Sequence, residues 1–237
     1  MAEFFFIVSC EHASRHIPHA CRHWFPSQVT AGHRAYDPGA LAYARELAGA
    51  LRAHLFTATV SRLLVDTNRS LHHPRLHSLY LRDAPAELKQ RLVQTYYLPY
   101  RQQIEQAIAS ALSRKQNVIH LAAHSFTPEL DGITRNAELG LLYDPRRTRE
   151  KNLAVAWQSA LHASKPEFRI RRNYPYRGRA DGFPSALRRC NGEEDYLGFE
   201  IEINQAMLCQ PGRVAAALRA WFVRETAEFF KGLGGAG

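Results

Sequence analysis

Six segments of the chain are rich in apolar and β-favouring residues, and each predicts a β-strand. The segments at 4–10 and 118–123 are apolar along almost their whole length, which is typical of strands buried on both faces of a sheet. The others mix or alternate apolar and polar residues. They lie at 55–66, 138–145, 168–172 and 196–205.

Between these strands, apolar residues recur every three or four positions, which predicts amphipathic helices. These helices follow Asp37-Pro38, cover 86–115 and 148–163, and end the chain at 213–231. Pro99 predicts a break or kink in the second of them. Strands alternating with helices indicate an α/β fold. We expect a single domain over residues 1–237, with a flexible tail from about residue 232.

The composition is that of an ordinary globular protein, with 46% hydrophobic and 22% charged residues. No apolar run approaches the roughly 20 residues of a membrane span, and the N-terminal FFFIV is too short for a signal peptide. A cytoplasmic location and no membrane partner are therefore expected. The four cysteines lack C-x-x-C spacing and are interpreted as reduced thiols, although Cys10 beside Glu11 is an alternative nucleophile.

The net charge of +9 comes mostly from arginine, and arginines are densest at 169–189. One hypothesis is a nucleic-acid patch in which Tyr174 and Tyr176 stack on bases. The interpretation we favour is a basic surface around the site of a small acidic substrate. Nucleic acid is therefore the less favoured partner.

Two histidines are predicted at the carboxyl ends of buried strands, where open α/β sheets place their ligands. His12 follows the first strand, and His124 follows the apolar run at 118–123 and precedes Ser125. Each can be a metal ligand, a general base, or a structural histidine bound to a backbone carbonyl. His120 lies deeper in its strand and is expected in the core.

Two polar segments can complete such a site. Asp37 precedes a helix, so its carboxylate is either an N-cap or a metal ligand. The segment SRLLVDTNRS, at 61–70, holds an Asn-Arg pair whose planar donors match a carboxylate. Asp66 in that segment can hold an arginine in place, and a surface salt-bridge cluster is the alternative interpretation.

The segment YLGFEIEINQ places Glu200 and Glu202 on one face of a strand that is otherwise apolar. Two buried acids are costly unless they are solvated, paired or functional, and a half-exposed edge strand is the alternative. Together with two imidazoles and a carboxylate ligand, such a glutamate suits metal-assisted hydrolysis of an amide that bears a carboxylate. Zinc would keep an open coordination position, and the glutamate would move protons.

The motifs CEHASRHIP, SRLLVDTNRS, AHSFTP, RNYPYRG and GFEIEINQ, in this order, resemble those of the N-formylglutamate amidohydrolase family, over about residues 5–210. The resemblance implies a three-layer α/β/α sandwich around a mixed, mostly parallel sheet, like that of zinc carboxypeptidases, phosphorylase/hydrolase-like proteins and aspartoacylases. It also implies zinc or another divalent metal, and hydrolysis of an N-acyl amino acid such as N-formyl-L-glutamate to formate, or another acid, and the amino acid.

Residue by residue, the resemblance implies His12 and His124 as metal ligands. It favours Asp37 as the third ligand, with Glu11 as the alternative. The glutamate that the relatives carry three positions after the first histidine is absent, because Arg15 stands there.

The resemblance further implies Glu202 as general base, with Glu200 tuning it by like-charge repulsion. Arg62 is expected both to assist catalysis and to bind substrate. The other expected substrate-binding residues are Asn68, Arg69, Ser125 and Arg177.

The substrate stays open at this point. The segment after AHSFTP lacks the glycine- and phenylalanine-containing loop associated with authentic formylglutamate hydrolases. Another N-acyl amino acid or small amide is therefore an alternative substrate, and a protein of this fold without turnover is a further alternative.

Overall fold

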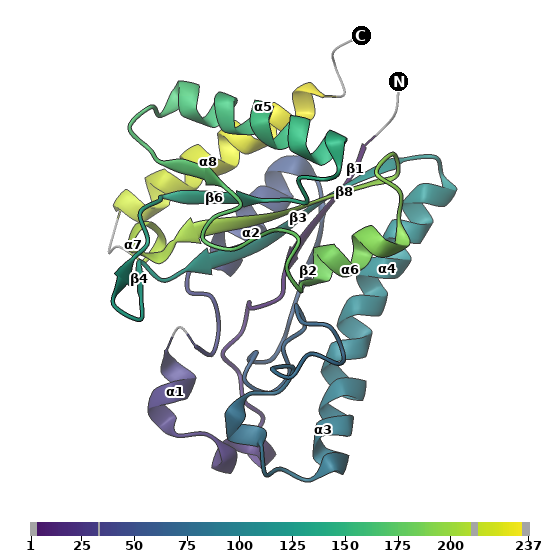
Figure 1. Cartoon of the computed structure of the whole chain (residues 1–237), viewed down its shortest axis with the longest axis vertical. Helices are drawn as coiled ribbons and strands as arrows, with labels where there is room; N and C mark the ends of the chain where they lie inside the picture. Colours follow the sequence, from purple (N-terminus) through teal and green to yellow (C-terminus); the bar gives the residue numbers. More distant parts are fainter. Residues whose placement is uncertain (1–3, 33, 210–212, 234–237) are drawn as a thin grey trace.

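A computed structural model describes residues 4–32, 34–209 and 213–233 of the chain. Its centre is a six-stranded sheet with the strand order β2-β1-β3-β8-β6-β7 (Figure 1). The strands of this sheet are β1 (Phe4–Cys10), β2 (His54–Thr57), β3 (Asn117–Phe126), β6 (Leu139–Leu142), β7 (Ile170–Arg172) and β8 (Tyr196–Asn204). A separate hairpin joins β4 (Glu129–Leu130) to β5 (Ile133–Thr134).

The sheet is mixed and mostly parallel, as expected for the fold class. β2, β1, β3 and β8 run parallel to one another, whereas β6 runs antiparallel to β8 and parallel to β7. β3 and β8 are central and buried along almost their whole length, which explains why their sequences are so apolar. The alternative that 196–205 forms a half-exposed edge strand is therefore wrong.

Helices cover both faces of the sheet and complete the three layers (Figure 1). One face packs against α2 (Ala40–Leu51), α5 (Thr148–Ser164) and α8 (Arg213–Gly232). The other packs against α4 (Leu98–Ser113) and α6 (Phe183–Cys190). Short helices complete the list: η1 (His19–Trp24), α1 (Ser27–Ala31), η2 (Leu79–Leu81), α3 (Ala86–Leu92), η3 (Val93–Tyr97) and α7 (Gln205–Leu208).

The alternation along β8 decides which side chains reach the site. Phe199, Ile201 and Ile203 point into the larger apolar layer, which also holds the fully buried Trp157. Glu200 and Glu202 therefore point to the opposite face, where α6 begins. No helix within the described ranges combines the length and apolar composition that a membrane span needs.

A lobe of loops and short helices lies beyond the carboxyl ends of β1 and β2 (Figure 1). We call residues 13–32, 34–36 and 58–98 the loop lobe. It has an apolar cluster of its own, separate from the two layers on the sheet. Its buried members are Ile17, Cys21, Phe25, Ala35, Val60, Leu63, Leu64, Val65, Leu76, Leu81, Ala84, Leu92 and Tyr97.

The helical segment at 86–115 is interrupted before Pro99, as predicted. Val93–Tyr97 form a π-helical turn between α3 and α4. A proline lacks the N–H of a regular helix and clashes with the carbonyl four residues earlier, and a wider turn relieves that conflict. Asp131 and Gly132 take positive φ angles of 51° and 77° at the tip of the β4–β5 hairpin, as the two central residues of a tight hairpin turn do.

Two other expectations are wrong in part. The strand predicted at 55–66 ends at Thr57, because the rest of that segment turns into the loop lobe. No helix is among the elements predicted between 172 and 196, yet α6 begins there directly after Gly182. The flexible tail predicted from about residue 232 falls mostly outside the described residues.

Candidate metal centre

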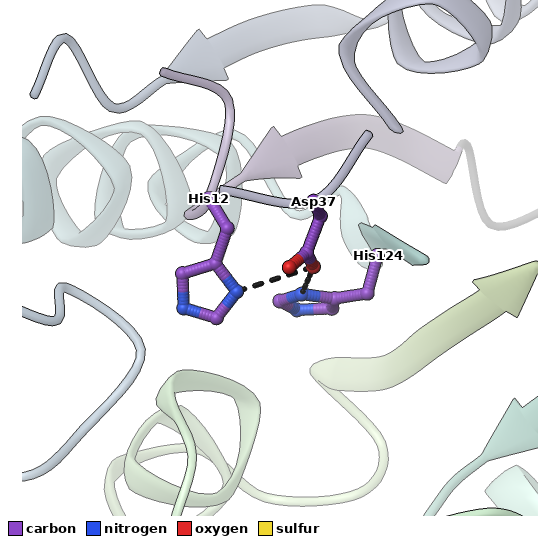
Figure 2. Close-up of side chains that lie close together, drawn as sticks. All are labelled: His12, Asp37 and His124. Carbon is purple, nitrogen blue, oxygen red and sulfur yellow. Dashed lines mark hydrogen bonds and ion pairs between the residues drawn. The ribbon is translucent and has the colours of Figure 1, made fainter. Parts of the chain in front are cut away.

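His12, Asp37 and His124 meet at the carboxyl edge of the sheet (Figure 2). Asp37 Oδ2 lies 3.2 Å from His12 Nδ1 and 3.1 Å from His124 Nδ1. All three side chains are buried, and one ligand atom from each lies within 4.8 Å of the others. His12 lies just beyond β1, His124 lies in β3, and Asp37 precedes α2, so three separate parts of the chain build the cluster.

Asp37 does not cap the helix that follows it. The helix begins at Ala40 after Gly39, whose φ of 81° suits glycine, and no side-chain cap bond is formed there among the described residues. The Asp37 carboxylate instead accepts a hydrogen bond from the Ser125 N–H at 3.3 Å. Burial alone would raise the pKa of Asp37, but His12, His124 and Arg62 outweigh it and hold that pKa well below its usual range.

Each imidazole has a second carboxylate on its other side. Asp66 Oδ1 lies 2.8 Å from His12 Nε2, and Glu11 Oε2 lies 3.3 Å from His124 Nε2. A carboxylate behind a histidine selects the tautomer with the proton on the nearer nitrogen. The Nδ1 atoms are then free to donate electron pairs to a metal beside Asp37.

The charges at the cluster are unbalanced without a cation. Of the three carboxylates of Glu11, Asp37 and Asp66, two pair with arginines: Arg62 lies 3.4 Å from Asp37 and 2.9 Å from Asp66, and Arg69 lies 3.9 Å from Asp66. Three carboxylates against two guanidiniums leave one negative charge that a bound cation would balance. Burial lowers the pKa of His124, but Asp37 and Glu11 outweigh it and hold that pKa well above its usual range.

Glu202 brings another carboxylate to the same place. It lies opposite His124 in the β3–β8 register and is 5% exposed. Its Oε2 atom is buried and has no hydrogen-bond partner among the described residues. Burial, together with the carboxylates of Asp37 and Glu200, raises the pKa of Glu202 to about 8, although His124 acts in the opposite direction.

The residues present therefore fit a divalent cation. Two imidazoles and one carboxylate form a donor set that zinc uses in catalytic sites, where three protein ligands leave a position open. The unpartnered oxygen of Glu202 needs a proton donor, such as water, beside that position.

The segment at 61–70 reaches the cluster from the loop lobe. Arg62 and Asp66 pair as predicted, but Asp66 is only 4% exposed, so this is not a surface salt bridge. Asn68 Oδ1 accepts from the Phe183 N–H at 2.7 Å, and Arg69 donates to the Asp181 carbonyl at 3.1 Å. These contacts tie the loop lobe to the start of α6.

Two of the expected substrate-binding residues take other positions. The Ser125 hydroxyl donates to the Pro38 carbonyl at 2.8 Å and so supports the turn that carries Asp37. Arg177 is exposed on the loop before α6, and no ion pair of its guanidinium is seen among the described residues. For both, a substrate contact stays a prediction.

Sequence reasoning missed three contacts that shape the cluster. Asp66 was expected to hold an arginine, and it also faces His12. Glu11 was considered as a ligand, and it lies behind His124 instead. The Tyr100 hydroxyl donates to Glu11 at 3.0 Å, and the apolar spacing of the helix that carries Tyr100 does not indicate that this side chain reaches the cluster.

The arginines at 169–189 are partly used inside the fold. Arg169 pairs with Glu138, and the buried Arg188 pairs with Glu150 at 3.0 Å. The Arg171 guanidinium lies 4.4 Å from the centre of the Tyr174 ring, so that ring is already covered. Most arginines of this segment are nevertheless exposed, so nucleic-acid binding stays an alternative prediction.

Comparisons with known proteins agree with the family and the fold expected from the sequence. The N-formylglutamate amidohydrolase family matches residues 4–209. The structure of gene product Atu2144 from Agrobacterium tumefaciens is 27% identical, with a TM-score of 0.83, and covers 98% of this chain and 93% of its own. An N-formylglutamate amidohydrolase from Ralstonia eutropha JMP134 is 19% identical, with a TM-score of 0.65 and coverages of 96% and 93%.

None of the curated proteins compared with the chain matches it significantly. The likeness to the Ralstonia enzyme supports the fold alone, because its identity is low. The family match spans most of the chain and includes every residue of the cluster. The chain therefore belongs to the N-formylglutamate amidohydrolase family and is a hydrolase of that family.

Proposed function

We propose that this protein uses a divalent metal, zinc in the first place, to hydrolyse the amide bond of an N-acyl amino acid such as N-formyl-L-glutamate. The products are formate, or another acid, and the free amino acid. The observation that carries the proposal is the buried His12–Asp37–His124 cluster with the unpartnered oxygen of Glu202 close by.

His12, Asp37 and His124 are the proposed ligands. Asp37 is preferred over Glu11 because its Oδ2 atom faces the Nδ1 atoms of both histidines, whereas Glu11 meets His124 on the opposite side of the ring. When bound, a divalent metal supplies a Lewis acid that polarises the amide carbonyl and acidifies water.

Glu202 is the proposed general base. In its ionised form it takes a proton from water as the water oxygen attacks the amide carbon. It then gives that proton to the leaving nitrogen as the C–N bond breaks, so the carboxylate is restored. Glu200 lies on the same face of β8, and its charge helps to raise the pKa of Glu202.

Asn68 and Arg69 are the proposed anchors for the substrate carboxylate. Asn68 Oδ1 is already bonded to the Phe183 N–H, which turns the amide so that its NH₂ group can donate to a ligand. Arg62 completes the fork beside Asp37, and it assists the reaction by holding that ligand. Ser125 and Arg177 stay in the proposed binding set. The proposed partner is therefore a small acidic N-acyl amino acid.

Other features stay predictions beside this proposal: a single catalytic domain, a cytoplasmic location and the identity of the acyl group. A different N-acyl amino acid or small amide would use the same cluster and the same Glu202. The acyl group must fit beside Glu202, and the amino acid carboxylate must reach Asn68 and Arg69.

A product assay tests the proposal. Purified protein is treated with chelator, reloaded with zinc, and given N-formyl-L-glutamate, N-acetyl-L-glutamate and N-formyl-L-leucine. We expect acid and amino acid to be released in equal amounts by the loaded protein only, and faster from the glutamate derivatives. Equal activity before and after chelation would contradict the metal role, and no turnover of any N-acyl amino acid would contradict the function.

A further inference from the structure

Glu11 is the most deeply buried acid at the site, and the catalytic proposal gives it no role. Its side chain is 1% exposed. Oε2 faces His124 Nε2 at 3.3 Å, and Oε1 accepts a hydrogen bond from the Tyr100 hydroxyl at 3.0 Å. Neither Glu11 Oε2 nor His124 Nε2 makes a hydrogen bond to any other described group.

The environment of Glu11 differs from that of Asp66, the acid behind the other histidine. Asp66 is paired with Arg62 at 2.9 Å, so its charge is already compensated. In the described part of the chain, Glu11 pairs with no arginine or lysine. A buried carboxylate in this position is costly unless a cation lies close by.

We infer that Glu11, held by Tyr100, is a positioning pair for His124 that sets how tightly the cluster binds a divalent metal. This inference rests on the proposed metal role of His12, Asp37 and His124. Glu11 fixes the imidazole with Nδ1 directed at Asp37, and its negative charge favours a cation on the far side of the ring. Tyr100 keeps the carboxylate in the rotamer that faces His124.

A second group of buried, hydrogen-bonded side chains offers a matched control. His120 lies between the Ser9 hydroxyl and the Tyr196 hydroxyl, at 2.7 Å from each. Tyr196 and Tyr100 are both buried tyrosines of the same apolar layer, and each makes one hydrogen bond through its hydroxyl. Only Tyr100 contacts Glu11, so Tyr100→Phe and Tyr196→Phe remove similar groups with different links to His124.

The test measures binding of Co²⁺ and Zn²⁺ by chelator competition, together with the visible absorption spectrum of the Co²⁺ form. We expect Glu11→Gln to weaken metal binding by roughly 10–100-fold and to change the cobalt spectrum. Tyr100→Phe should weaken binding less, by a few-fold, with a spectral change in the same direction. Tyr196→Phe should bind metal as the wild type does. Circular dichroism checks the fold of each variant.

The outcomes separate this inference from the proposed function. If the wild type binds no divalent metal, the metal role itself fails, and this inference fails with it. If the wild type binds metal but Glu11→Gln matches it in affinity and spectrum, only the positioning role fails. An equal loss in Tyr100→Phe and Tyr196→Phe would also overturn it, because loosening of the core would then explain the effect. If Glu11→Gln does not fold, the comparison of the two tyrosine variants decides.

Discussion

The layered sheet and the loop lobe contribute to the same site by different physical means. The sheet places His124 and Glu202 opposite each other through the backbone register of β3 and β8, and apolar layers cover both of its faces. The loop lobe places Asp66 and Asn68 through side-chain hydrogen bonds, over a smaller apolar cluster.

The difference predicts what each part controls. Backbone register holds a side chain firmly, so the sheet is suited to residues that must meet the reacting atoms within fractions of an ångström. Loop residues held by side-chain hydrogen bonds are suited to orienting ligands and to binding substrate. Changes in the sheet should therefore affect turnover, and changes in the loop lobe should affect affinity.

The largest effect is expected on the sheet side, at Glu202. Glu202→Gln removes the base but keeps the shape of the side chain, so metal content should be unchanged and turnover should fall by about 10²–10⁴-fold. Steady-state kinetics and metal analysis of the same samples check both results. Glu200→Gln, on the same face of β8, is the matched variant and should lose much less. A larger loss in Glu200→Gln would transfer the role of base to Glu200.

The next effect is expected in the loop lobe, at Asp66. Asp66→Asn removes the carboxylate that faces His12 Nε2, and it leaves Arg62 with one partner fewer. We expect metal affinity to fall by roughly 10–100-fold, while turnover of fully loaded protein changes less. Titration with zinc against a competing chelator measures the affinity. Loss of turnover at saturating zinc with unchanged affinity would break the division between sheet and loop lobe.

Arg69 should have a smaller effect, restricted to substrate binding. Arg69→Ala removes one charged donor from the proposed carboxylate fork, so KM should rise by about tenfold with little change in kcat. Arg172→Ala is the control, because Arg172 is an exposed arginine on β7 at the far edge of the sheet. An equal KM for wild type and Arg69→Ala would count against the fork.

The smallest effect concerns acid stability of the metal-free protein. Burial raises the pKa of Asp66, but Arg62 and His12 outweigh it and hold that pKa well below its usual range. The folded state then binds fewer protons than the unfolded state in acid. The contribution of Asp66 to the free energy of unfolding is fully present above about pH 4. It is lost as the pH falls further, by at most about 1.4 kcal/mol per pH unit.

Urea unfolding in chelator between pH 2.5 and 6 measures this slope. Asp66→Asn should flatten it, and Glu138→Gln, which changes an acid far from the cluster, should flatten it much less. Glu202 acts in the opposite direction, since its pKa is raised to about 8. Its contribution favours the folded state at low pH and is lost as the pH rises from about 4.5 to 8. An unchanged acid slope in Asp66→Asn would show that the pair with Arg62 does not stabilise the fold.

The sheet could be predicted from the sequence to a greater extent than the loop lobe. Periodicity placed β1, β3 and β8, and thereby His124 at a strand end and Glu200 and Glu202 on one face. It could not decide between a ligand and an N-cap for Asp37, because an Asp-Pro pair suits a helix start equally well. The structure excludes the N-cap, because the helix begins at Ala40 after Gly39, and the ligand role stays a proposal.

Side-chain contacts between distant segments lie beyond pattern reasoning. Asp66 and His12 are 54 residues apart, and Tyr100 and Glu11 are 89 apart. Loop segments have no period that fixes which way a side chain points, so only the folded chain reveals these pairs. The strand predicted at 55–66 failed for the same reason: its β-favouring residues pack into the cluster of the loop lobe, and tertiary packing overrides their propensity.

We propose that His12, Asp37 and His124 together hold one divalent metal. The metal content of the purified protein is the most direct measurement of this site. Protein purified without a histidine tag is analysed by mass spectrometry for zinc and other divalent metals, beside His12→Ala, His124→Ala and the core variant His120→Ala. We expect about one metal ion per chain in the wild type, retention in a folded His120→Ala, and loss in the other two. Full metal content in both His12→Ala and His124→Ala would contradict this proposal.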